Sequence, residues 1–142
     1  MKKAFSLFCV LVVIICCNGC TGDMSGIEGY SWKLKIASYL ENDEMVVAMM
    51  DEASSAWPEA AVLEVTLTAI NGELYIVDHT NDVTYIGTYK LTGRDPGVIN
   101  YDVNFDNCSG YALVGMTTYA DGNQVPTLPL KVGKYTLEFY AE

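Results

Sequence analysis

The stretch Val62-Leu-Glu-Val-Thr-Leu-Thr-Ala-Ile-Asn-Gly-Glu-Leu-Tyr-Ile-Val-Asp78 carries the clearest fold signal in the chain. At its centre, Asn71-Gly72 is a favoured pair for a two-residue type I′ turn, because both turn positions need positive φ. Such a turn aligns three residue pairs across a hairpin: Ala69 with Leu74, Leu67 with Ile76, and Val65 with Asp78. Because the aligned apolar residues share one face, turn chemistry and hydrophobic pattern predict the same register.

Alternation with a period of two predicts further strands on both sides of this hairpin. These strands are expected at residues 30–36, 84–91, 99–106, 111–119 and 135–139. Gly87, in the middle of one of them, predicts a bend or bulge. The segment Val125–Val132 contains Pro126 and Pro129, which predict an edge or irregular strand because proline lacks the backbone N–H.

Residues 42–57 follow a different period. Five apolar residues recur there at helical spacing: Val46, Met49, Met50, Ala53 and Trp57. Asn42 or Asp43 would cap such a helix, and Pro58 would end it. We therefore expect one short helix packed on the core, whose Met45–Met50 part could alternatively contact a partner.

About eight strands joined by short turns indicate a mainly β protein with an antiparallel meander. A meander of this length curls, and closure into an eight-stranded barrel removes its exposed edges. We expect this barrel to occupy residues 29–142. An immunoglobulin-like β-sandwich is the alternative, since residues 133–139 would equally suit its last strand.

The N-terminus has the features of an export signal. Lys2 and Lys3 precede an apolar run over residues 4–15, which is too short for a membrane span of roughly 20 residues. Residues 1–20 are therefore expected to form a signal peptide. The polar residues 21–28 are expected to form a tether.

The pair Gly19-Cys20 resembles the end of a bacterial lipoprotein signal, in which a small residue precedes a cysteine that receives diacylglycerol. The resemblance implies that Cys20 carries acyl chains such as palmitate. Cys17 is the alternative attachment site, and ordinary signal cleavage without lipid is the third possibility. The implied location is the cell envelope, with anchoring in the outer membrane favoured over the inner membrane.

Charge and cysteine content restrict the partners and the stabilising bonds. Eighteen acidic residues against eight basic ones give a net charge of −10, which repels nucleic acid backbones. Four of the five cysteines lie in residues 1–20, so Cys108 has no intradomain disulfide partner.

The order of the expected elements, with Gly29-Tyr30-Ser31-Trp32 on the first strand, resembles a lipocalin-like (calycin) barrel. In particular, the chain is similar to small Bacteroidetes-type lipoproteins, a group of unassigned function. The family hallmark is Gly-x-Trp, and the spacing here is one residue longer. The resemblance implies that Trp32 closes one barrel end. The arginine that packs on this tryptophan in the family has no counterpart, since only Lys131 and Lys134 lie nearby.

No catalytic or phosphate-binding motif occurs in the sequence. The run Asp102-x-Asn104-x-Asp106 opens like a calcium loop, but Asn107 and Leu113 replace the required glycine and glutamate. We therefore expect no enzymatic activity, no cofactor and no metal site.

Two functions remain open. An eight-stranded barrel either is filled by side chains or holds one small ligand. A small hydrophobic or amphipathic ligand would be lined by seven residues: Trp32, Tyr85, Tyr89, Tyr101, Phe105, Leu137 and Phe139. Alternatively these side chains fill the core, and the lipoprotein engages an envelope protein partner.

Overall fold

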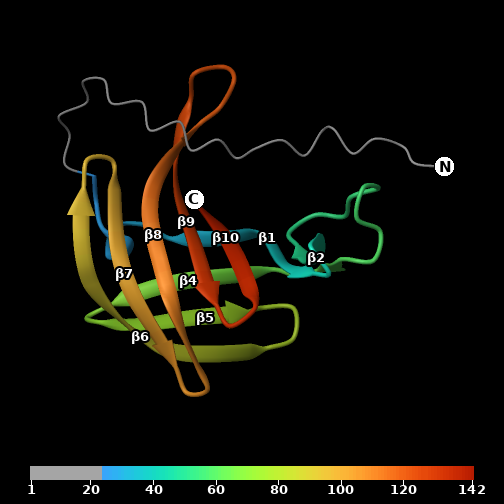
Figure 1. Cartoon of the computed structure of the whole chain (residues 1–142), viewed down its shortest axis with the longest axis horizontal. Coiled ribbons are helices and arrows are strands. Elements are labelled where there is room, and N and C mark those ends of the chain that lie inside the picture. The colour runs from blue at the N-terminus through green and yellow to red at the C-terminus, as the bar shows by residue number, and fades with distance from the viewer. Residues whose placement is uncertain (1–23) are drawn as a thin grey trace.

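The computed structural model describes residues 24–142, and the regular elements of this part of the chain are β-strands apart from one short helix (Figure 1). The expected signal peptide, with Cys17 and Cys20, and the first three residues of the expected tether lie outside the described residues. A short 3₁₀ helix, η1 (Ile27–Gly29), comes first. The strands that follow are β1 (Trp32–Glu41), β2 (Glu44–Met50), β3 (Ala61–Val62), β4 (Val65–Ile70), β5 (Glu73–Asp78), β6 (Val83–Asp95), β7 (Val98–Phe105), β8 (Cys108–Thr118), β9 (Gln124–Val132) and β10 (Tyr135–Ala141).

The hairpin of β4 and β5 has the predicted register. Three expected pairs are present: Val65 with Asp78, Leu67 with Ile76, and Ala69 with Leu74. Asn71 and Gly72 have φ values of 50° and 85°, as a type I′ turn requires. The prediction is therefore confirmed at the level of individual residue pairs.

Eight strands close into an antiparallel barrel, as predicted. Strands β4 to β9 each pair with the next strand along the chain, and β1 pairs with both β4 and β10. Figure 1 shows β10 beside β1, so the last strand completes the ring that the first strand begins. The sandwich alternative is wrong, because all strands belong to one continuous sheet.

Strand β6 curves strongly, so that β4 and β5 run across the direction of β7 and β8 (Figure 1). Gly87 lies on this strand and is buried. A Cβ atom there would come within 2.7 Å of both the Phe105 ring and the Asn104 carbonyl oxygen. The glycine therefore allows β7 to approach closely where the sheet bends.

Strand β9 differs from the edge strand that its prolines predict. It lies between β8 and β10, and both Pro126 and Pro129 have cross-strand partners. The β8–β9 ladder is nevertheless interrupted between Ala112–Leu130 and Gly115–Thr127, a gap that contains Pro129. This internal strand accommodates Pro129 at a position where its pairing with β8 is interrupted.

The expected helix over residues 42–57 is wrong. Residues Glu44–Met50 form strand β2. This strand pairs with β1, from the pair of Glu44 with Glu41 to the pair of Met50 with Ile36. Asn42 and Asp43 have φ values of 52° and 64°, so they form the turn of a hairpin and do not cap a helix. Asn and Asp favour both roles, and the β-branched pair Val46-Val47 favours the strand.

The end of the expected tether belongs to the fold. Met24 packs against the core, and Ile27 in η1 is fully buried. The Ile27 N–H donates to the Tyr101 hydroxyl at 3.1 Å, and the Ile27 carbonyl accepts a bond from Trp32 Nε1 at 2.8 Å. Residues 24–28 thus close one end of the barrel, and the domain begins before Gly29.

Within residues 24–142 the structure contains no helix with the length and apolar character that a transmembrane helix requires.

Candidate functional site

The barrel interior brings together six of the seven predicted lining residues. Trp32, Tyr101 and Phe139 are 0%, 5% and 0% exposed. Tyr89, Phe105 and Leu137 are partly buried and pack against the same core.

The seventh residue, Tyr85, lies apart and is 55% exposed. Tyr85 lies on the inner face of β6, because it pairs with the buried residue Ile76. The pairing of β6 with β7 begins only at Gly87–Phe105, so Tyr85 lies beyond the part of β6 that β7 pairs with. The expectation that Tyr85 lines the interior is therefore corrected, because strand phase does not show where a neighbouring strand ends.

Side chains fill the interior. Ten large side chains from the barrel strands and η1 are fully buried: Trp32, Phe139, Ile27, Leu34, Leu67, Leu74, Leu128, Leu130, Val103 and Val114. Tyr101 packs edge-on against Tyr89, with ring centroids 5.7 Å apart, and its hydroxyl accepts the Ile27 N–H. No buried side-chain polar atom of the described residues lacks a hydrogen-bond partner. The core therefore needs no ligand to satisfy its polar groups.

Hydrogen bonds and aromatic contacts fix the closed end of the barrel. The Tyr89 hydroxyl donates to the Glu28 carboxylate, which ties η1 to β6. The Tyr30 ring packs edge-on against Trp32 at a centroid distance of 5.1 Å. Trp32 thus lies at the barrel end that η1 covers.

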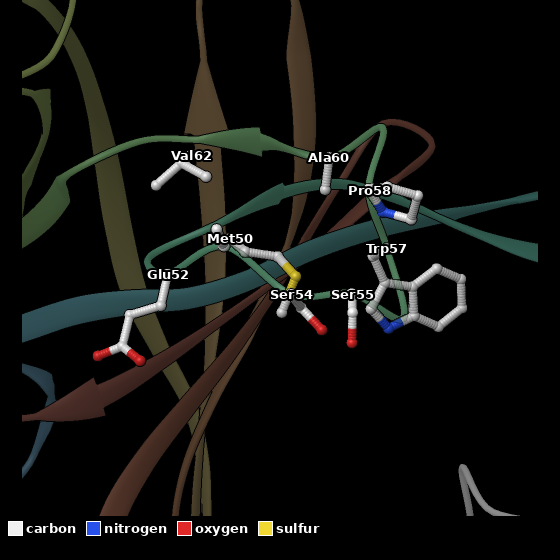
Figure 2. Close-up of a pocket in the computed structure, with 9 residues that line it drawn as sticks. Met50, Glu52, Ser54, Ser55, Trp57, Pro58, Ala60 and Val62 are labelled. Atoms are coloured by element: carbon white, nitrogen blue, oxygen red, sulfur yellow. The ribbon is translucent and has the colours of Figure 1, made fainter.

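One hollow lies outside the barrel, where residues 51–60 connect β2 to β3. It has a volume of about 300 Å³. Figure 2 shows its wall, formed by Met50, Glu52, Ala53, Ser54, Ser55, Trp57, Pro58, Ala60 and Val62. Two backbone bonds shape the loop: Trp57 N–H to the Ser54 carbonyl and Ala60 N–H to the Trp57 carbonyl, both 3.1 Å. This hollow was not predicted from the sequence, because the spacing of Trp57 matched a helix.

A second hollow also has a volume of about 300 Å³ and lies where β5, β6 and β7 meet. Its wall consists of Glu73, Ile86, Gly87, Thr88, Asn104, Phe105 and Asp106. Phe105 therefore contacts both the core and this outer hollow. The Glu73 carboxylate is already engaged, since it accepts a bond from the Tyr75 hydroxyl at 2.5 Å.

Two partly buried ionisable residues lie on the outer face of β10. Burial raises the pKa of the Glu138 carboxyl above its ordinary value. The pKa of Tyr140 is also raised, first by burial and then by the charges of Glu138 and Tyr119. The alternation of Tyr135, Leu137 and Phe139 placed Glu138 on the outer face, but it gave no sign that the carboxylate would be half-buried.

A short ion pair lies close to this face. Lys35 Nζ is 2.6 Å from Asp51 Oδ2, and this bond raises the pKa of Lys35. The pairing fixes the start of the loop that forms the first hollow, because Asp51 directly follows β2. Asp51 N–H also donates to the Lys35 carbonyl at 3.2 Å.

In the calcium-like run, Asp102 and Asn104 lie on strand β7, and Asp106 lies in the turn that follows it. Asp102 and Asn104 are exposed and pair across the sheet with Lys90 and Thr88. In the described part of the chain, no group of three or more His, Cys, Asp or Glu side chains is arranged to hold a metal ion.

Comparison with known proteins gives no relative. No protein-family model matches the chain, and no curated protein and no solved structure matches it.

Proposed function

We propose that this chain is a lipid-anchored cell-envelope protein that binds a partner protein through its outer surface, with the barrel as a filled scaffold. The observation that carries the proposal is the packed interior. Trp32, Val103 and Phe139 have no exposed surface, so a ligand could enter only by displacing them.

A small amphipathic ligand inside the barrel is the second candidate, and the geometry supports it less. Such sites are concave and bury most of the ligand. Both hollows described above lie outside the barrel, and neither contains Trp32, Tyr101 or Phe139.

Export and anchoring are proposed from the leader. With Cys20 as the lipidated residue, only the short link to Met24 separates the acyl chains from the closed barrel end. Four residue steps reach at most about 14 Å. The end formed by η1 would then face the membrane, and the side wall of the barrel would remain open to a partner.

Mass spectrometry of the mature N-terminus tests the anchor. We expect a diacylglycerol-modified Cys20, and replacement Cys20→Ala should remove the lipid mass and release the protein from membranes. Modification at Cys17 would correct the attachment site, and an unmodified mature N-terminus would refute the anchor.

Purification from detergent-solubilised membranes tests the interaction. A chain with an affinity tag after Glu142 should recover a partner in constant ratio after a second, size-based separation. Recovery of the monomer alone, under conditions that preserve other envelope complexes, would contradict the proposal.

A further inference from the structure

One row of side chains crosses five strands on the outside of the molecule. The strand register aligns Val62 with Met50, Met50 with Ile36, Ile36 with Glu138, and Glu138 with Pro129. Residues that pair directly across a sheet share a face, so these five side chains form a continuous stripe, which we call the outer row. Four of the five are partly buried, and Val62 is 49% exposed.

The strands that extend the outer row are not needed to close the barrel. β2 and β3 continue the sheet beyond β1, although β1 already pairs with β4 and β10. Their presence adds Met50 and Val62 to the row, and both residues line the hollow that contains Trp57 (Figure 2). The outer row therefore runs at one end into a recess whose wall has both apolar and polar side chains.

Glu138 is the only charged member of the outer row, and no cation neutralises it. The one ion pair in residues 24–142 joins Lys35 to Asp51. Burial alone accounts for the raised pKa of Glu138, with no opposing contribution from a nearby positive charge. A partly buried carboxylate of this kind lacks full hydration and gains from any cation placed against it.

Aromatic and apolar groups flank this carboxylate. Tyr140 lies two residues further along β10 on the same face, and Ile36 and Pro129 are the cross-strand neighbours of Glu138. Lys33 and Lys131 lie on the same face, opposite Tyr140 and Thr136. Neither forms an ion pair with Glu138, so an arriving cation would meet an unpaired carboxylate beside apolar groups. Charge complementarity and the apolar flanks together select an occupant with a single positive charge between apolar groups.

We propose that the outer row docks a partner polypeptide segment in which one lysine or arginine, flanked by apolar residues, pairs with the Glu138 carboxylate. This inference rests on the proposed function, since it assigns the surface and the chemistry of the partner. The net charge of −10 would also speed the approach of a cationic segment.

An array of synthetic nonapeptides tests the assignment. Each peptide carries a central lysine or arginine between apolar residues, and matched peptides carry N-acetyllysine or glutamate there. The full chain, held in detergent micelles, is the probe. We expect the chain to bind the cationic peptides at least about tenfold more tightly than the matched peptides. Glu138→Gln should lose affinity for the cationic peptides by about the same factor.

Asp102→Asn is the matched control, because it removes one exposed carboxylate from the outer face of β7 and leaves the outer row unchanged. It should bind the peptides within about twofold of the unmodified chain. The melting temperature of Glu138→Gln is expected to equal or exceed that of the unmodified chain. A loss of peptide binding in this variant would then not result from unfolding.

Several results would overturn the inference. These are no binding, equal binding of N-acetyllysine peptides, or equal losses in Glu138→Gln and Asp102→Asn. Self-association of the chain that Glu138→Gln abolishes would assign the outer row to a second copy and overturn it as well. None of these results affects the co-purification or the mass of the N-terminus, so a failure here is distinguishable from a failure of the proposed function.

Discussion

Replacement of Trp32 by phenylalanine tests how the end of the barrel is closed. Trp32 has no exposed surface, and its Nε1–H donates to the Ile27 carbonyl at 2.8 Å. Phenylalanine cannot donate, so the buried carbonyl loses this partner at a cost of about 1–3 kcal/mol. The smaller ring also leaves a void, which adds about 1–2 kcal/mol. We therefore expect a loss of about 3 kcal/mol in the free energy of unfolding.

Trp57→Phe is the matched control, since Trp57 is only partly buried and lies at the outer hollow. Urea unfolding of both variants, followed by far-ultraviolet circular dichroism, should give a loss below about 1 kcal/mol for Trp57→Phe. Amide hydrogen exchange at Ile27 should also accelerate in Trp32→Phe, because η1 is held less firmly. Equal losses in the two variants would refute the closure of the barrel end by Trp32.

Three further predictions concern stability. Gly110→Ala should lower the free energy of unfolding in urea by about 3 kcal/mol or more. The added Cβ would lie 1.7 Å from the Lys131 carbonyl oxygen, so β8 would have to move away from β9. A loss below about 0.5 kcal/mol would contradict this packing. The pKa of Asp78 is lowered, chiefly because the Asn81 side chain donates a hydrogen bond to its carboxylate. The ionised Asp78 therefore stabilises the fold at pH values above its unfolded pKa of about 3.9. This stabilisation is lost as the pH falls through the lowered pKa of the folded state. Asp78→Asn should therefore melt lower at neutral pH, by a margin that shrinks in acid, and a constant margin would argue against the assignment. Burial raises the pKa of Glu138, so the folded protein binds this proton more tightly than the unfolded chain and loses stability as the pH rises from about 4.3 through the raised pKa. Glu138→Gln should therefore have a higher melting temperature than the unmodified chain at neutral pH and the same melting temperature in acid. A lower melting temperature of the variant at neutral pH would contradict an energetic cost of burying the carboxylate.

Local signals in the sequence predicted the parts of the fold that depend on local chemistry. Asn71-Gly72 fixes a turn type, and the turn fixes the pairing of Leu67 with Ile76. Asn42-Asp43 fixes a turn of the same kind, but both residues also favour helix caps, and the spacing of Val46 and Met49 matched a helix. A hairpin whose turn residues serve two roles needs the pairing with Tyr39 and Leu40 on β1 to decide between them.

Barrel closure was expected from the number of strands, but its geometry depends on contacts between distant residues. The pairing of Trp32 with Ala141 joins the two ends of the described chain, and a bulge between Leu34 and Ile36 changes its register. That bulge places Ile36 opposite Glu138. The outer row therefore cannot be read from strand periodicity, which gives the face of each residue and not its neighbour on the next strand.

The interior residues illustrate the same distinction. Alternation correctly placed Trp32, Tyr101 and Phe139 on the inner face, and all three are buried. Their packing against Ile27 and one another decides whether space remains for a ligand. The alternation of side chains along a strand shows which face each one occupies, but it does not show how much volume remains between facing strands.

A nuclear magnetic resonance titration tests the central claim, that recognition occurs on the outside of a filled barrel. The chain carries two tryptophans, one in the core and one at the outer hollow, so their indole N–H signals report on the two locations separately. During addition of a lysine-bearing nonapeptide, we predict that the Trp57 indole and the Ile36, Met50 and Glu138 amides shift. The Trp32 indole, bonded to the Ile27 carbonyl, should stay unchanged. A shift of the Trp32 indole at equal peptide concentration, with an unchanged Trp57 signal, would contradict the claim and place the binding site inside the barrel.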